Sequence, residues 1–334
     1  MLRIGCYGIN GHTLFGAGGH LGRAQIVAVA GVTDAQYEAL RKDASETIAA
    51  APRYASLDDL LAYGDLDLVA LCSPRRDEQA GHTVAALEAG KHVYAEKPLA
   101  LTIEDLARIR AAARQSGCQV RACTGSSYDS THCAMKAAVA SGKIGEVVQV
   151  FAQKSYPYHD DRPQDRGMDG GLILQAGIHA VCFARWVTGR EFAAVSAFDT
   201  RLGNPRQGDL QMAASICFEL DSGGVGVAVF NYLQPRTDPY WGNDQLRVHG
   251  TRGMVETVDG YTRRSVTTAD RKRTALRVTA QPSFFQAYVD LLLDGTPMRA
   301  SNEDALRETE VVICMQEAAE TGRRVVVGHK AVTP

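Results

Sequence analysis

Short apolar segments alternate with amphipathic segments over the first 120 residues of the chain. Apolar runs without polar alternation are typical of parallel strands that are covered on both faces, and apolar positions at helical spacing indicate helices. The second predicted helix begins at Thr102, a good N-cap residue, and ends at Gly117. Strands and helices linked by short connections predict βαβ units in a doubly wound parallel sheet. The predicted strands are residues 2–7, 25–32 and 66–72, and the predicted helices are residues 77–90 and 102–116.

From about residue 145 the pattern changes. Several strand-like runs follow one another with Gly- or Pro-containing turns between them, which indicates a largely antiparallel sheet. The sequence therefore predicts an α/β protein with an N-terminal Rossmann domain (1–122) and an α+β domain (123–334) with a large open sheet. We expect the last helix to pack back on the first domain. The predicted helices here are residues 172–187, 283–293 and 303–321, and the predicted strands are residues 192–200, 210–220, 224–232 and 245–249.

The composition narrows the class of protein further. The 334 residues are 45% hydrophobic and 22% charged, which suits a globular protein of two domains. The net charge of −2 creates no field that would attract nucleic acid or an anionic membrane. We interpret the scattered basic pairs as solvated surface: Arg75-Arg76, Arg263-Arg264 and Arg323-Arg324. No apolar run approaches the roughly 20 residues of a membrane helix, and the N-terminal segment has no secretory-signal pattern, so we expect a cytoplasmic protein.

The eight cysteines show no CxxC pair and no histidine-rich partner segment. Cys6, Cys72 and Cys217 lie inside apolar strand-like runs, where cysteine behaves as a small hydrophobic residue. We therefore expect reduced, mostly buried thiols and no metal site.

A glycine-containing turn follows the first predicted strand, where a dinucleotide fold places the pyrophosphate. The turn matches the GxGxxG pattern poorly because Asn10 and Thr13 replace two glycines, but asparagine tolerates left-handed backbone angles. A second glycine cluster at 16–19 would weaken the first helix. We predict that this turn contacts the cofactor through Gly8, Ile9, Asn10, Gly11 and His12.

The choice between NAD and NADP stays open. Asp34 lies near the end of the second strand, about three residues later than a ribose-binding acid would, and we include it in the cofactor site. Arg41, Arg75 and Arg76 are alternatives that could bind a 2′-phosphate instead. Ser73 and Pro74, which close the third strand, are also predicted to contact the cofactor.

Two segments carry a resemblance to a known family. Residues 86–99 read ALEAGKHVYAEKPL, with the Glu-Lys-Pro triplet at 96–98, and residues 170–179 read GGLILQAGIH. The chain resembles the Gfo/Idh/MocA oxidoreductases, which include inositol and glucose dehydrogenases and glucose-fructose oxidoreductase, and weaker matches extend over nearly the whole chain. The resemblance implies that Glu96 and Lys97 serve the cofactor, that the Lys97-Pro98 bond is cis, and that the chain forms a homodimer or homotetramer.

The chemistry of alcohol oxidation gives these residues roles. A cation must polarise the oxygen while a group that titrates near neutrality takes the proton. Lys97 follows a strand end, where ligands of open α/β sheets bind, and His179 has the required type of side chain. Gln175 stands where many relatives carry an aspartate and shares a helix face with His179, so we expect it to orient the substrate.

Other segments are weaker candidates for the substrate site. Residues 156–162 are rich in aromatic and hydrogen-bonding groups, and Tyr240-Trp241 could stack on a sugar; a surface loop or core would use the same residue types. The stretch 126–131 lacks an arginine that many relatives carry.

The sequence thus predicts hydride transfer between NAD or NADP and a hydroxyl-bearing sugar or polyol, with Lys97, His179 and Gln175 as catalytic residues. One alternative is a lyase or hydrolase that uses tightly held NAD for transient oxidation. Another is a cofactor-binding regulator that has lost catalysis.

Overall fold

The computed structural model describes residues 1–15, 21–43 and 51–328. The chain divides into two compact units, each assembled from several segments. Unit 1 contains residues Met1–Cys123, Gly167–Asp169 and Pro282–Thr309, and unit 2 contains Thr124–Arg166, Gly170–Gln281 and Glu310–Pro334.

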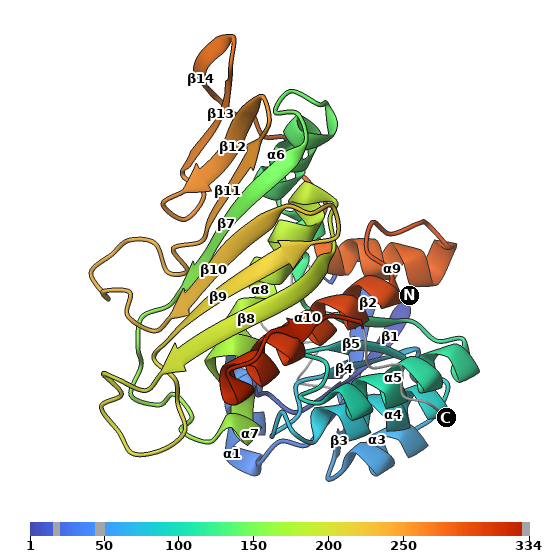
Figure 1. The fold of residues 1–334 in the computed structure, drawn as a ribbon. Helices are drawn as coiled ribbons and strands as arrows, with labels where there is room; N and C mark the ends of the chain where they lie inside the picture. Colours follow the sequence, from blue (N-terminus) through green and yellow to red (C-terminus); the bar gives the residue numbers. More distant parts are fainter. Residues whose placement is uncertain (16–20, 44–50, 329–334) are drawn as a thin grey trace. The chain divides into compact units, whose positions relative to one another are not determined.

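Unit 1 is built on a sheet of six parallel strands in the order β3-β2-β1-β4-β5-β6 (Figure 1). The strand order reverses between β1 and β4, which is the switch point at which such sheets bind ligands. The predicted doubly wound parallel sheet is confirmed. The strands are β1 (Leu2–Tyr7), β2 (Ala24–Ala30), β3 (Arg53–Tyr54), β4 (Leu68–Leu71), β5 (His92–Ala95) and β6 (Val120–Ala122).

Helices cover both faces of this sheet because its strands are apolar on both sides. The side chains of Leu2 and Ile4 in β1 share a core with Tyr288 of α9. On the opposite face a Cβ at Gly5 would lie 3.1 Å from Leu60 Cδ1 of α3 and 2.8 Å from Cδ1 of Leu66, which follows that helix. The helices of unit 1 are α1 (Asp34–Asp43), α3 (Leu57–Ala62), α4 (Gln79–Glu88), α5 (Ile103–Ser116) and α9 (Phe284–Asp294).

The connection from β1 to β2 departs from the usual βαβ pattern. Its described parts, residues 8–15 and 21–23, contain no α-helix. The second glycine cluster, at 16–19, lies outside the residues that the structure describes. The turn after β1 therefore does not lead directly into a long helix.

Unit 2 is built on a nine-stranded sheet in the order β14-β13-β12-β11-β7-β10-β9-β8-β15. The β7–β10 pair is parallel and its neighbours are antiparallel, so the predicted mostly antiparallel sheet is confirmed. The strands are β7 (Val147–Ser155), β8 (Phe192–Thr200), β9 (Ala213–Leu220), β10 (Val225–Asn231), β11 (Gln245–Gly250), β12 (Gly253–Val258), β13 (Arg263–Thr268), β14 (Arg271–Ala275) and β15 (Val325–Val326).

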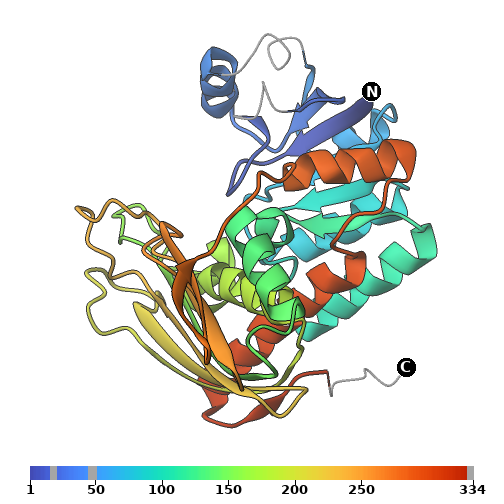
Figure 2. The same cartoon turned by 90° about the horizontal axis from the view of Figure 1, so that it is seen from above.

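One face of this sheet packs against the helices α6 (Ser130–Ala140) and α8 (Gly171–Thr188), as Figures 1 and 2 show. At Gly177 of α8 a Cβ would lie 2.8 Å from the ring of Phe230, so only glycine allows this approach. Burial alternates along β9 and β10, which leaves Val225, Val227 and Cys217 exposed on the other face. The expectation that Cys217 is buried is therefore wrong, because it belongs to the open face.

The segment Arg166–Thr188, made of α7 (Arg166–Asp169) and α8, is long and apolar enough by length and composition to cross a membrane. Its apolar window is 78% buried within the protein, as a core helix would be. The last long helix, α10 (Asn302–Thr321), contributes its residues up to Thr309 to unit 1 and the rest to unit 2.

Candidate active site

The turn after β1 lies at the switch point between β1 and β4. Gly8 has a φ of +73°, and a Cβ at this position would lie 2.2 Å from the carbonyl oxygen of Cys72, so the turn requires glycine here. The Gly8 N–H donates to the Ala30 carbonyl (2.9 Å) and the Asn10 N–H to the Cys72 carbonyl (3.1 Å). These bonds fix the turn to the carboxyl ends of β2 and β4.

Asn10 acts through its side chain. The positive φ angles of the turn belong to Gly8 and Gly11, so the turn does not use the tolerance of asparagine for left-handed backbone angles. Its Nδ2 donates instead to the carbonyl oxygens of Pro74 (3.1 Å) and Met168 (2.6 Å). An amide side chain therefore holds the turn where the GxGxxG pattern has its second glycine.

A buried carboxylate lies directly beneath the turn. Glu96 follows β5 and is 4% exposed, and a Cβ at Gly11 would lie 2.6 Å from Glu96 Cγ. Its Oε2 accepts the backbone N–H of His12 (2.9 Å), lies 3.0 Å from His12 Nδ1, and accepts the thiol of Cys123 (2.9 Å). Sequence reasoning did not single out Cys123.

The charge on Glu96 is stabilised despite its burial. Burial would raise the pKa of this carboxyl, but the hydrogen bond from His12 and the positive charge of Lys97 outweigh it and hold the pKa at about 2. The same surroundings raise the pKa of the Cys123 thiol well above its usual value, through burial first and the Glu96 charge second. The site therefore holds a carboxylate and a protonated thiol at neutral pH.

Lys97 is completely buried, and its Nζ lies 3.9 Å from Glu96 Oε1. The Lys97-Pro98 peptide bond is cis, which confirms the expectation from the resemblance. Lys97 lies just beyond β5, at the carboxyl edge of the sheet, and the nearby Glu96 carboxylate offsets part of the cost of burying its ammonium.

A buried pair of side chains connects the turn to the Lys97 segment. Arg76 Nη2 donates to the Asn10 carbonyl (2.7 Å), and Arg76 Nη1 donates to Gln79 Oε1. Gln79 Nε2 in turn donates to the carbonyl oxygens of Glu96 (2.5 Å) and Pro98 (3.0 Å). Both side chains are almost fully buried, so the interpretation of Arg76 as solvated surface is wrong, and its guanidinium supports the turn rather than binding a 2′-phosphate.

The other predicted cofactor residues lie close to the ends of β1, β2 and β4. Ile9 is half-buried in the turn. Asp34 begins α1, is exposed, and forms an ion pair with Arg53. Ser73 is buried with its hydroxyl 2.9 Å from His82 Nδ1, and the carbonyl of Pro74 holds Asn10 as described.

In unit 2, the helix α8 presents a short polar stripe. Gln175 and His179 lie one helical turn apart and are partly exposed, whereas the intervening residues 176–178 are buried. The Tyr232 hydroxyl donates to Gln175 Oε1 (3.3 Å), and the guanidinium of Arg162 lies 3.8 Å from the centre of the Tyr232 ring. Tyr232 directly follows β10. It was not predicted as a site residue because nothing in the sequence distinguishes it from any other tyrosine in a strand.

Aromatic rings continue from this stripe. Tyr156 lies 6.4 Å from Tyr232 and 6.1 Å from Trp241, and His159 lies 5.0 Å from Trp241, measured between ring centres. Trp241 is 59% exposed, so its ring is available to a ligand. Residues of the 156–162 segment and of Tyr240-Trp241 therefore join one cluster with Gln175, as stacking surfaces for sugars do.

One group of metal-binding residue types lies among the described residues. The donor atoms of His12, Glu96 and Cys123 all lie within 4.8 Å of one another, although the sequence predicted no metal site. The hydrogen bonds among these groups already account for their grouping, and we draw no metal chemistry from it.

The chain has a doubly wound parallel sheet with a glycine-containing turn at its switch point, and an α+β unit with a polar stripe. This combination is that of the dinucleotide-dependent oxidoreductases. Comparison with known proteins specifies the family. Residues 3–123 match the sequence model of the "Oxidoreductase family, NAD-binding Rossmann fold", and residues 132–256 match the "GFO/IDH/MocA C-terminal domain". The chain belongs to the Gfo/Idh/MocA family of NAD-binding oxidoreductases.

Individual relatives agree with this assignment. The chain is 29% identical over 271 residues to inositol 2-dehydrogenase of Rhizobium meliloti (75% of this chain, 79% of the relative). It is 32% identical over 237 residues to inositol 2-dehydrogenase of Pseudomonas syringae pv. syringae (70% and 66%). A solved structure from Thermotoga maritima superposes with a TM-score of 0.89 at 27% identity and covers 98% of this chain and 100% of its own.

Proposed function

We propose that the protein transfers hydride between NAD and a CH–OH carbon of a polyol or sugar. The fully buried Lys97 beside Glu96, at the carboxyl edge of the parallel sheet, is the observation that carries this proposal. The family assignment and the two relatives named inositol 2-dehydrogenase support the substrate class.

The turn of unit 1 fits a dinucleotide. Gly11 and His12 are exposed at the switch point, and Gly8 and Asn10 are fixed to the ends of the neighbouring strands. These residues, with Glu96 beneath them, would hold the cofactor. When bound, NAD supplies the acceptor for the hydride that leaves the substrate carbon.

The residues of the chain would handle the oxygen and its proton. Lys97 donates to the substrate oxygen and stabilises its developing negative charge. His179 takes the hydroxyl proton as the C–O double bond forms, and returns it in the reverse direction. Gln175, held by Tyr232, donates its amide to a neighbouring hydroxyl and so orients the substrate.

We propose NAD rather than NADP because Asp34 is an exposed carboxylate just beyond β2. A carboxylate there can bind the ribose hydroxyls and repels a 2′-phosphate. Fluorescence titration with NADH and NADPH tests this part. Saturable binding of NADH with weaker NADPH binding is expected, and the absence of binding by both, with no nucleotide released on denaturation, would sink the proposal.

The oligomeric state and the location of the protein belong to the same proposal. A homodimer or homotetramer would cover the exposed Val225 and Val227 on the open face of the nine-stranded sheet. Light scattering that gives a monomer at micromolar concentration would refute this, and cell fractionation tests the proposed cytoplasmic location.

A further inference from the structure

A row of cross-strand partners spans four strands at one end of the nine-stranded sheet, and its members on three of these strands are polar. Arg247 of β11 pairs in register with Glu256 of β12, Glu256 with Ser265 of β13, and Ser265 with Ala275 of β14. Cross-strand partners point to the same face of a sheet. Val255, one residue away, is fully buried on the face that packs against α6, so this row lies on the opposite face.

Glu256 forms the centre of the row. Its side chain is 5% exposed, and its Oε2 accepts Arg247 Nε (2.8 Å). Its Oε1 pairs with Arg273 Nη2 (2.8 Å) and accepts the Ser265 hydroxyl (3.2 Å). Burial would raise the pKa of this carboxyl, but the bond from Arg247 and the charges of both arginines lower it. Glu256 is thus an internal counterion that fixes two guanidinium groups.

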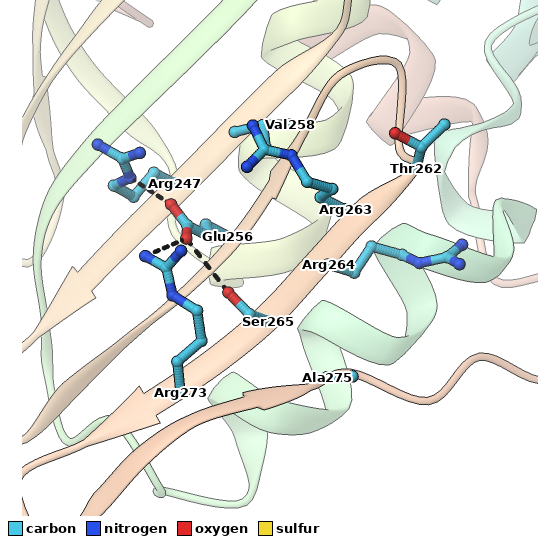
Figure 3. A pocket seen from close by; sticks show the side chains of 9 residues that line it. All are labelled: Arg247, Glu256, Val258, Thr262, Arg263, Arg264, Ser265, Arg273 and Ala275. Atoms are coloured by element: carbon cyan, nitrogen blue, oxygen red, sulfur yellow. Dashed lines mark hydrogen bonds and ion pairs between the residues drawn. The ribbon is translucent and has the colours of Figure 1, made fainter.

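These residues line a pocket of about 420 Å³. Figure 3 shows Arg247 and Arg273 converging on Glu256 from two sides, with Arg263 beside them and Arg264 pointing away. Arg264 donates instead to Thr131 of α6. The lining residues are Arg247, Glu256, Val258, Thr262, Arg263, Arg264, Ser265, Arg273 and Ala275.

The pocket has more positive charge than its acids neutralise. Arg264 points away, so three arginines remain at the pocket, and Glu256 and the Asp259 partner of Arg263 neutralise two of their charges, which leaves one positive charge. Within the described part of the chain, Arg247 and Arg273 have no acidic partner other than Glu256, and each guanidinium carries five N–H donors. Donors on both groups therefore stay available to a ligand.

Protection of the sheet edge does not explain this arrangement. Arginine and lysine on an edge strand such as β14 prevent pairing with other chains. However, Arg247 belongs to β11, three strands inside the edge, and a buried carboxylate is not needed for edge protection. The interpretation of Arg263 as simple solvated surface is also incomplete, because it lines the pocket.

We propose that this arginine pocket binds a phosphate or diphosphate group of a small organic molecule, separately from the hydride-transfer site. Guanidinium groups bind phosphate oxygens in pairs, and the unneutralised positive charge of the pocket favours an anion. The volume exceeds that of a phosphate alone and lies in the range of small-molecule sites, and Val258 and Ala275 supply an apolar wall for the attached group.

Calorimetric titration of the full-length protein with inorganic pyrophosphate, at saturating NADH, tests the proposal. NADH fills the dinucleotide site, so heat must come from elsewhere. One pyrophosphate per chain should bind, and the double variant Arg247→Gln/Arg273→Gln should weaken binding by about tenfold or more because it removes two charged donors. The control Arg201→Gln/Arg323→Gln removes the same charge from exposed positions of unit 2 and should change affinity little.

The variant Glu256→Gln gives an independent test with the opposite sign. Removing the central negative charge should strengthen pyrophosphate binding, whereas a merely structural role of Glu256 predicts no gain. Absence of binding, competition with NADH, equal weakening in the control variant, or an unchanged affinity in Glu256→Gln would each overturn the proposal. If NADH does not bind, the proposed cofactor site is refuted. The pyrophosphate affinities of wild type and the variants can then still be compared, and this comparison tests the arginine pocket by itself.

Discussion

The charge of Glu96 should stabilise the fold strongly, and Glu96→Gln removes that charge while keeping the shape of the side chain. The pKa of the carboxyl is about 2 in the folded protein against 4.5 ordinarily, and each unit corresponds to about 1.36 kcal/mol. The charged form therefore contributes about 3 kcal/mol to the free energy of unfolding at pH 7. The buried Lys97 ammonium also loses its carboxylate neighbour in this variant.

The sign of the pH dependence follows from the lowered pKa. A carboxyl whose pKa falls on folding stabilises the protein fully above its unfolded pKa of about 4.5, and this contribution is lost as the pH falls toward 2. Urea unfolding followed by far-ultraviolet circular dichroism should show Glu96→Gln less stable by about 3 kcal/mol at pH 7. The difference from wild type should shrink steadily between pH 4.5 and pH 2.

Glu88→Gln is the matched control, because Glu88 is an exposed carboxyl near the end of α4. Its unfolding free energy should differ from wild type by less than about 0.5 kcal/mol at every pH. Equal stability of Glu96→Gln and wild type at pH 7, or a difference that persists unchanged at pH 2, would refute the reasoning.

Three further predictions concern the cofactor and substrate residues. Arg76→Gln should weaken NADH binding by about tenfold or more in a fluorescence titration, because the turn loses a buried charged donor. The control Arg75→Gln, at the neighbouring position, should have little effect, and equal losses of affinity in the two variants would contradict this. Gln175→Asp should shift the acidic limb of the pH–kcat/KM profile to higher pH, because a carboxylate one turn from His179 stabilises the imidazolium. An unchanged profile would show that His179 is not the titrating group. Asp34→Ala should reduce the ratio of NADPH to NADH dissociation constants, and a constant ratio would remove Asp34 from cofactor selection.

Much of the fold was predictable because the hydrophobic pattern is local. The strand at residues 2–7 was predicted with its observed bounds, and the predicted cap of α5 is present, with the Thr102 side chain accepting the Asp105 N–H and Gly117 in the left-handed conformation. The strand β7 was missed although it lies at the centre of its sheet, because Gln149, Gln153 and Lys154 interrupt its apolar pattern.

The supports of the site could not be predicted in the same way. The residues Arg76 and Gln79 look like any polar pair around the start of a helix, and their burial depends on contacts with residues up to 66 positions away. Cys123 meets Glu96 only because β5 and β6 are neighbours. Asn10 was placed in the correct turn for the wrong reason, since its amide rather than its backbone angle holds it.

The most direct test of hydride transfer is the formation of NADH, followed at 340 nm, from NAD and a panel of polyols and sugars that includes inositols. Wild type is expected to reduce NAD with at least one of them, and Lys97→Gln should lower kcat/KM by about two to four orders of magnitude. The exposed control Lys143→Gln should retain wild-type turnover. Saturable NADH binding without turnover of any substrate, or equal turnover in wild type and Lys97→Gln, would contradict the account.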